Sequence, residues 1–340
     1  MKALVLQAKG RLVSADVDAP GQELAPDDLL VRTKAATICT SDLADIEHNA
    51  FNIKLPMVMG HECAGIVAGI GENVTAFKRG DRVAVHPFMQ CNRCDSCIRG
   101  LGHLCDDIEH LGITRGGGFA EYFTIRQDKA RIIPDGVGFP EATLMEPVSV
   151  CLEGIERAGV GEGKNVLIVG DGPFGILMSK LCVLYKPARV ILLGRHPFRM
   201  SYAANAVTIN EKESDNIQDD IRNATIGGAG IDCAILCAAA PDAVGISIEA
   251  LRARGTLSVF SALPGKTPVD LFKLHVKELN ICGSCNDPDY MDKAMTHITN
   301  NTGNINQIIT HKLPFAQWEE AFHLAAKERD KALKVTMLFE

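Results

Sequence analysis

Side chains that commonly bind zinc stand at three separated places in the sequence: Cys39, His61 and Glu146. A thiolate, an imidazole and a carboxylate are all zinc ligands, and three protein ligands with one water form the usual catalytic zinc site. Glu62, directly after His61, adds a second carboxylate at the same place. We therefore expect one open zinc site beside a group that is oxidised or reduced.

Four further cysteines form the most specific local pattern in the chain. Two, two and seven residues separate Cys91, Cys94, Cys97 and Cys105. Four thiolates on short turns complete a tetrahedral structural zinc and leave no open position. Free or disulfide-bonded thiols are one alternative and an iron–sulfur cluster is another. The ferredoxin run continues with three residues and Cys-Pro, whereas Asp106 follows the fourth cysteine here. We expect a second, structural zinc in this loop.

A dinucleotide-binding fingerprint lies near the middle of the chain. The apolar run 166–169 leads into Gly170-Asp171-Gly172-Pro173-Phe174-Gly175 and then into a helical stretch, 176–185. Gly170 allows the tight turn, Gly172 lets the backbone approach the pyrophosphate, and Gly175 permits close packing of helix and strand. The free N–H groups of the helix N-terminus suit the phosphates. The sequence predicts a cofactor site lined by this loop, Pro173 and Phe174 included, rather than a glycine-rich turn without a ligand.

The residues after the second strand of this unit indicate which cofactor is used. An NAD-binding unit usually has Asp or Glu about twenty residues past the fingerprint, for the ribose hydroxyls. This chain has Gly194, Arg195 and Arg199 in that stretch and no acid. Guanidinium groups bind phosphate through charge-assisted hydrogen bonds. We expect the two arginines to face the 2′-phosphate of NADP(H), which is favoured over NAD(H); solvated surface arginines are the alternative.

Composition excludes several classes of protein. The chain has 340 residues, a net charge of -7 and 46% hydrophobic residues. This length suggests about two domains, and the negative charge leaves no basic surface for nucleic acid or for anionic lipid. No apolar run reaches the roughly 18 residues that span a bilayer, and the start of the chain does not look like a signal peptide. With its cysteines read as metal ligands and free thiols, a cytoplasmic protein is expected.

The order of predicted elements divides the chain into two domains. Short strands at 2–6, 12–15 and 29–35, a helical segment from Cys39 to about Asn49, and β-rich runs from 60 to 85 predict a small barrel. From 148 to 285, strands at 166–169, 189–193, 232–238, 256–260 and 279–282 alternate with helical stretches, which predicts a doubly wound parallel sheet. A helix at 318–326 and a strand at 334–339 are expected to pack back on the barrel. The fold class is α/β, with a β-rich domain at 1–147 and 286–340 and a cofactor domain at 148–285.

Taken together, these motifs resemble the zinc-dependent medium-chain alcohol dehydrogenases over nearly the whole chain. Glu146-Pro147 followed by Val148-Ser149-Val150 resembles the sorbitol and polyol dehydrogenase branch. The resemblance implies a GroES-like catalytic domain, a Rossmann cofactor domain, two zinc ions per chain and an assembly of two or four copies. It implies reversible hydride transfer between NAD(P)(H) and a polyol or its ketose.

The resemblance also assigns roles to residues of the first domain. It implies that Cys39 and His61 bind the catalytic zinc, completed by Glu62 or Glu146; the order of the two glutamates stays open. Asp42 matches the carboxylate that orients the zinc-bound histidine. Ser41 matches the hydroxyl that passes the substrate proton towards solvent.

The chain departs from the family in two places. Ala44 stands where a relay histidine is often found, and His48 is displaced by four residues. Animal sorbitol dehydrogenases have an Arg-Tyr pair where this chain has about Asn286-Asp287, so polyols are expected as a class rather than sorbitol itself. A threonine-type, amino-alcohol or simple secondary-alcohol dehydrogenase is the alternative enzyme. An NADP(H)-binding sensor without activity and an iron-cluster electron-transfer protein are the alternatives outside this class.

Overall fold

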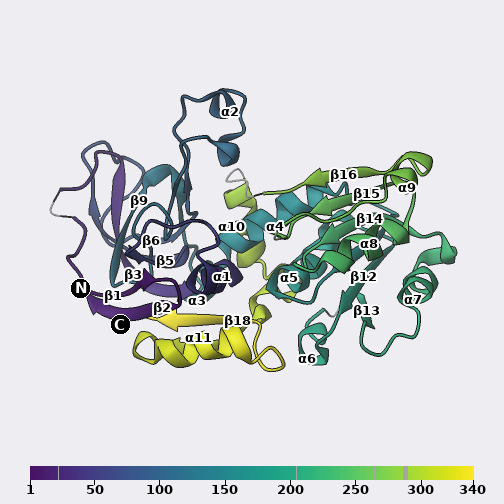
Figure 1. The fold of residues 1–340 in the computed structure, drawn as a ribbon. Coiled ribbons are helices and arrows are strands. Elements are labelled where there is room, and N and C mark those ends of the chain that lie inside the picture. Colours follow the sequence, from purple (N-terminus) through teal and green to yellow (C-terminus); the bar gives the residue numbers. More distant parts are fainter. Residues whose placement is uncertain (22, 204, 264, 286–289) are drawn as a thin grey trace.

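The computed structural model describes residues 1–21, 23–203, 205–263, 265–285 and 290–340 (Figure 1). A β-rich domain, built from residues 1–142 and the C-terminal elements β17, α11 and β18, lies on one side in Figure 1. A domain of alternating strands and helices lies on the other side, with helices α4 and α10 between the two. The expected α/β architecture of two domains is confirmed.

The β-rich domain is a curved sheet with a small second sheet beside it. The larger sheet has the strand order β10-β6-β5-β3-β18-β17, with β9 also paired to β3, and the smaller has the order β2-β1-β4. Register shifts interrupt the pairing of β3 with β5, and such bulges bend a sheet towards closure. The strands are β1 (Lys2–Ala8), β2 (Arg11–Asp16), β3 (Asp28–Thr37), β4 (Met57–Val58), β5 (Glu62–Ile70), β6 (Arg82–Val85), β9 (Tyr122–Arg126) and β10 (Ala130–Ile132).

Helix α1 and a two-stranded lobe complete this domain. Helix α1 (Thr40–His48) begins where β3 ends, with Cys39 at its N-cap. Strands β7 (Phe88–Met89) and β8 (Glu109–His110) pair at the base of the lobe, which carries the short α2 (Asp95–Ile98). Helix α3 (Phe139–Ala142) ends the N-terminal part of this domain. It contacts strands β3 and β5, which lie far from it in the sequence.

The end of the chain returns to the β-rich domain. Strand β17 (Ile309–Pro314) pairs in parallel with β18 (Lys334–Leu338), which in turn pairs antiparallel with β3. Helix α11 (Trp318–Lys327) connects them and buries Ala321 and Phe322 in the core of this domain. The expected packing of the C-terminal helix and strand on the first domain is confirmed. This packing places Lys334, the first residue of β18, beside Glu62.

The second domain contains a six-stranded parallel sheet of order β13-β12-β11-β14-β15-β16. This is the 3-2-1-4-5-6 order of a doubly wound dinucleotide-binding sheet. Alternate residues of the central strand β11 face opposite sides: Val166 and Ile168 belong to one core cluster, and Leu167 and Val169 to the other. The strands are β11 (Asn165–Val169), β12 (Arg189–Gly194), β13 (Val207–Asn210), β14 (Ile231–Leu236), β15 (Leu251–Val259) and β16 (Asn280–Gly283). The helices are α5 (Pro173–Leu181), α6 (Pro197–Met200), α7 (Ile217–Ala224), α8 (Pro241–Ala250) and α9 (Leu271–Val276).

Helices α4 (Met145–Arg157) and α10 (Met291–Thr299) join the two domains. Their apolar side chains share a core with Ile168 and Leu192 of the parallel sheet and with Ala64 and Ala84 of the barrel. The expected domain boundary after residue 147 falls inside α4, and the one at residue 286 lies outside the described residues, as do Asn286 and Asp287. In the described part of the chain, no helix is both long and apolar enough to cross a membrane.

Candidate active site

Three of the predicted zinc ligands converge at the end of the barrel. One ligand atom each from Cys39, His61 and Glu62 lies within 4.8 Å of the others, and all three residues are buried. Strand pairing brings these residues together, because Thr37 at the end of β3 stands opposite Glu62 at the start of β5. Cys39, shortly after β3, and His61, directly before β5, therefore lie at the same end of the two strands. A buried cluster of thiol, imidazole and carboxylate fits a zinc ion in donor type.

Asp42 holds His61 and the backbone of Cys39 together. Asp42 Oδ1 lies 3.2 Å from His61 Nδ1, and Asp42 Oδ2 accepts a hydrogen bond of 2.9 Å from the backbone N–H of Cys39. Burial of His61 opposes protonation, but the Asp42 carboxylate outweighs it and raises the pKa of His61 well above its ordinary value. With Nδ1 engaged, Nε2 is left for the metal, and Ser41 Oγ lies 3.4 Å from it. The geometry matches the positioning role that the sequence predicts for Asp42.

Lys334 is a site residue that the sequence reasoning missed. Its Nζ donates to both carboxylate oxygens of Glu62, at 2.5 and 2.6 Å, and the two side chains are 2% and 0% exposed. Burial alone would lower the pKa of Lys334, but the Glu62 charge outweighs it and the pKa is raised. The ammonium also lies 5.6 Å from the ring centre of Phe174 in the dinucleotide loop. The signal in the sequence was a lone charged residue, Lys334, at the start of a strand that is otherwise buried and uncharged.

Glu146 lies in the first turn of α4 with its carboxylate close to this cluster. Its side chain is buried, and Oε2 has no hydrogen-bond partner among the described residues. Burial, followed by repulsion from the Glu62 charge, raises the pKa of Glu146 to about 7. Glu146 is not among the residues whose ligand atoms are mutually within 4.8 Å; Glu62 is. Which glutamate completes the zinc site stays a prediction.

Two buried histidines of the lobe's base were also missed by the sequence reasoning. The ring of His110 meets that of His61 edge-on, with centroids 5.5 Å apart, and Phe88 stands between His110 and His86. Burial and repulsion from His61 lower the pKa of His110 to about 3. Burial holds the pKa of His86 well below its ordinary value, and neither of its ring nitrogens has a partner among the described residues.

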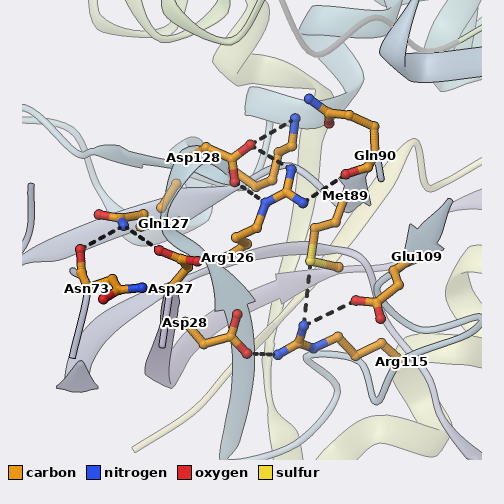
Figure 2. A network of polar contacts seen from close by, with 12 residues as sticks. Asp27, Asp28, Asn73, Met89, Gln90, Glu109, Arg115, Arg126, Gln127 and Asp128 are labelled. Carbon is orange, nitrogen blue, oxygen red and sulfur yellow. Dashed lines mark hydrogen bonds and ion pairs between the residues drawn. The ribbon is translucent and has the colours of Figure 1, made fainter. Parts of the chain in front are cut away.

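Polar contacts hold the lobe's base against the barrel (Figure 2). Arg115 pairs with the buried Asp28 of β3 and with Glu109 of β8, and its Nη1 also lies 3.8 Å from Met89 Sδ of β7. Arg126 Nη1 donates to the carbonyl oxygen that precedes the cysteine lobe, that of Gln90, at 2.8 Å. Both strands of the base are therefore anchored to the sheet that carries His61.

The four cysteines of the lobe form a compact sulfur cluster. One ligand atom from each of Cys91, Cys94, Cys97 and Cys105 lies within 4.8 Å of the others. The Sγ atoms of Cys91 and Cys97 are 4.0 Å apart, and those of Cys94 and Cys105 are 3.8 Å apart. A tetrahedron with zinc–sulfur bonds of about 2.3 Å has sulfur–sulfur edges of about 3.8 Å. Backbone N–H groups lower the pKa of Cys91 to about 6, which favours the thiolate that zinc requires.

The glycine loop has the geometry of a dinucleotide site. Gly170 has φ +116°, and Gly172 caps helix α5, whose first residue is Pro173. A side chain at Gly175 would stand 1.9 Å from the Gly170 carbonyl oxygen, whereas one at Gly172 would meet nothing within 4 Å. Gly175 is therefore needed for packing, while the open space over Gly172 is available to a pyrophosphate.

The arginines after β12 do not act as the expected pair. Arg199 is 8% exposed, and its Nε donates to the carbonyl oxygen of Ala332 at 3.1 Å. The prediction that Arg199 faces the cofactor phosphate is therefore wrong, because packing turns this side chain into the protein. Arg195 is half exposed and pairs through two hydrogen bonds with Glu211.

An acidic side chain lies at the end of β12, although no acidic residue directly follows this strand in the sequence. Asp171, inside the glycine loop, accepts hydrogen bonds of 2.6 Å from the backbone N–H groups of Arg195 and His196. A side chain at Gly194 would collide with the Asp171 carboxylate. The sequence reasoning missed this contact because it joins the ends of two different strands.

Comparisons with known proteins agree with this geometry. The Alcohol dehydrogenase GroES-like domain family matches residues 25–135, and the Zinc-binding dehydrogenase family matches residues 173–300. D-xylulose reductase A of Aspergillus niger is 32% identical over 309 residues, which covers 87% of this chain and 86% of the relative. Sorbitol dehydrogenase of Bacillus subtilis (strain 168) is 28% identical, covering 98% and 96% of the two chains. A crystal structure of a zinc-binding dehydrogenase from Sinorhizobium meliloti 1021 bound to NADP aligns with a TM-score of 0.90 and 28% identity, over 99% and 98% of the two chains.

The chain is an enzyme of the zinc-dependent medium-chain alcohol dehydrogenase class, acting on CH–OH donors with a nicotinamide cofactor. Within that class it belongs to the polyol dehydrogenase branch. The expected family and the expected branch are both confirmed.

Proposed function

We propose that the protein oxidises a secondary hydroxyl of a polyol or sugar alcohol to a ketose, reversibly, with a catalytic zinc and a preference for NADP(H). The buried cluster of Cys39, His61 and Glu62 carries this proposal. It stands on the barrel side of the helices that join the two domains, and Lys334 links it to Phe174 of the cofactor loop. The names of the relatives, sorbitol dehydrogenase and D-xylulose reductase, support polyols and ketoses as substrates.

Each residue around the cluster has a separate role in the proposed reaction. Zinc held by Cys39 and His61 would supply the positive charge that favours the alkoxide form of the substrate. Asp42 keeps the His61 ring in its tautomer and orientation. Ser41 Oγ lies beside His61 Nε2 and is placed to receive the hydroxyl proton. Glu146, buried and with Oε2 lacking a hydrogen-bond partner among the described residues, offers a second acceptor.

The relay ends at Ser41 within helix α1. Ala44 has no proton-carrying side chain, and His48 is exposed beside Glu47 at the end of the helix. Proton transfer from Ser41 to solvent therefore proceeds without a relay histidine on this helix.

The test is cofactor-dependent oxidation of sorbitol and xylitol by the zinc-loaded protein, followed at the absorbance of the reduced nicotinamide. His61→Ala is expected to abolish turnover, because it removes a zinc ligand. His48→Ala is the matched control, since His48 is 63% exposed in its side chain and outside the cluster. Full activity of His61→Ala would refute the proposed role of the cluster.

The NADP(H) preference rests on Arg195 alone, since Arg199 is buried. We expect NADPH to bind at least tenfold more tightly than NADH in a fluorescence titration. Arg195→Ala should remove about 1.4 kcal/mol or more of that difference, and Arg199→Ala should leave the ratio unchanged. A ratio near one in the wild type would show that Arg195 is only a surface partner of Glu211.

A homo-oligomer and a cytoplasmic location complete the proposal. Exposed apolar side chains gather at the outer edge of the parallel sheet, where α9 and the edge strand β16 lie (Figure 1): Leu271, Phe272, Val276 and Ile281. Such a patch favours association, and light scattering on the purified protein should report two or four copies. The buried cysteines Cys63, Cys151, Cys182 and Cys233 are free thiols, which suits a reducing compartment.

A further inference from the structure

His110 is a buried polar residue beside the cluster that takes no part in the proposed reaction steps. Its side chain is more than nine-tenths buried, and its ring meets the ring of His61 at 5.5 Å. It belongs to β8 in the lobe's base, whereas the zinc-cluster residues come from the barrel. His110 therefore enters the site from a separate element.

The hydrogen bonds of His110 determine what its ring can offer. Nδ1 lies 2.7 Å from the carbonyl oxygen of Leu111, and a carbonyl oxygen can only accept, so Nδ1 carries the proton. The other nitrogen, Nε2, then has a lone pair, and the hydrogen bond of the ring to a described residue is the one that Nδ1 makes. A neutral imidazole in this state is a hydrogen-bond acceptor for a hydroxyl group.

The ring is also held firmly in place. Phe88 packs edge-on against it, with centroids 4.5 Å apart and planes at 90°, and the backbone N–H of His110 donates to Thr114 Oγ1 at 2.7 Å. Arg115 ties β8 to β3 through Glu109 and Asp28 (Figure 2). An acceptor with few alternative positions discriminates well between ligands that have and lack the matching donor.

We propose that His110 Nε2 accepts a hydrogen bond from a substrate hydroxyl next to the reacting carbon, so that His110 selects polyols over alcohols with a single hydroxyl. This inference rests on the proposed function and narrows its substrate class to compounds with vicinal hydroxyls. The reacting hydroxyl and its neighbour are separated by one carbon–carbon bond. A ring in contact with a zinc-ligand ring is within reach of the second hydroxyl when the first is at the metal.

Three substitutions separate the two nitrogens of the ring. His110→Phe keeps the ring packing and removes both nitrogens. His110→Asn keeps a donor for Leu111 and removes the acceptor, whereas His110→Gln can place an amide oxygen where Nε2 stands. Each is compared with the wild type for oxidation of the best substrate among sorbitol, xylitol and 2,3-butanediol, and for zinc content and NADPH affinity.

We expect His110→Phe and His110→Asn to lower kcat/KM for that polyol about tenfold, mainly through KM, and His110→Gln to stay within about threefold of the wild type. Zinc content and NADPH affinity should stay at wild-type values. Wild-type kinetics in His110→Phe or His110→Asn would overturn the inference. So would a loss of zinc in proportion to the loss of activity, because His110 would then only support His61. A wild type that oxidises none of the three polyols would refute the proposed function itself.

Discussion

Breaking the buried pair of Glu62 and Lys334 is the perturbation whose size follows most directly from the structure. Lys334→Met replaces the ammonium by an apolar chain of similar length and leaves Glu62 without its partner. The two side chains are 0% and 2% exposed, so water cannot compensate. Removing one member of a buried pair typically destabilises a protein by about 3–5 kcal/mol, because the remaining charge stays buried.

This loss can be converted into a melting temperature. For 340 residues, the unfolding entropy near 60 °C is about 0.7 kcal/mol per kelvin. A loss of about 4 kcal/mol therefore lowers Tm by about 6 °C if the chain unfolds as one unit. The assay is differential scanning calorimetry of metal-stripped wild type and variant, with the double variant Glu62→Gln/Lys334→Met as the matched control.

The control and the zinc-loaded form test the reasoning separately. The double variant should recover most of the lost Tm, since no uncompensated charge remains. In the zinc-loaded protein, Lys334→Met should lower Tm by less than in the metal-stripped protein, because the ion adds positive charge beside Glu62. If the double variant lost as much Tm as the two single substitutions together, the pairing of Glu62 with Lys334 would be contradicted. An equal loss of Tm with and without zinc would contradict the placement of Glu62 at the metal.

Three other predictions follow from single features of the structure. The His86 ring is neutral when folded, because burial lowers its pKa, whereas in the unfolded chain it gains a proton below pH about 6.5; folded stability should therefore fall as the pH drops below that value. His86→Leu removes this dependence, so in urea unfolding its stability relative to the wild type should rise by about 1.4 kcal/mol between pH 8 and pH 5.5; parallel pH profiles of the two proteins would contradict this. Cys94→Ser should lower the zinc content by about one ion per chain in elemental analysis, while the zinc at the His61 site is retained. An unchanged zinc content would exclude zinc from the lobe. Gly175→Ala should lower Tm through its collision with the Gly170 carbonyl, and Gly172→Ala should weaken NADPH binding without lowering Tm; the reverse pattern would overturn the roles assigned to the two glycines.

Much of the fold was predictable because local patterns were strong. The buried apolar run before the glycine loop became β11, and the helical stretch after it became α5 followed by a short 3-10 turn. Helix α4 was not predicted. It begins with Met145-Glu146-Pro147, and its residues are buried on every side from Met145 to Ile155. Pro147 in its first turn reads as a helix breaker, although proline is tolerated there because the N–H groups of the first turn have no partner within the helix.

The candidate site was predictable where its residues are neighbours or carry unusual chemistry. Cys39, His61 and Glu62 were chosen by type, and β3–β5 pairing brings them together. Lys334 and His110 could not be placed, because each reaches the site through pairing between distant segments. Arg199 illustrates the opposite error: its spacing from Arg195 suggested a shared target, but packing against Ala332 decided its direction.

A zinc titration of the metal-stripped protein shows whether turnover depends on the metal held by His61. Polyol oxidation and bound zinc are measured together as zinc is added back to the wild type and to His61→Ala. We expect wild-type turnover to be absent without metal and to return with zinc, whereas His61→Ala should bind zinc in its cysteine lobe alone and stay inactive. Turnover by the metal-free wild type, or recovery of activity in His61→Ala, would contradict it.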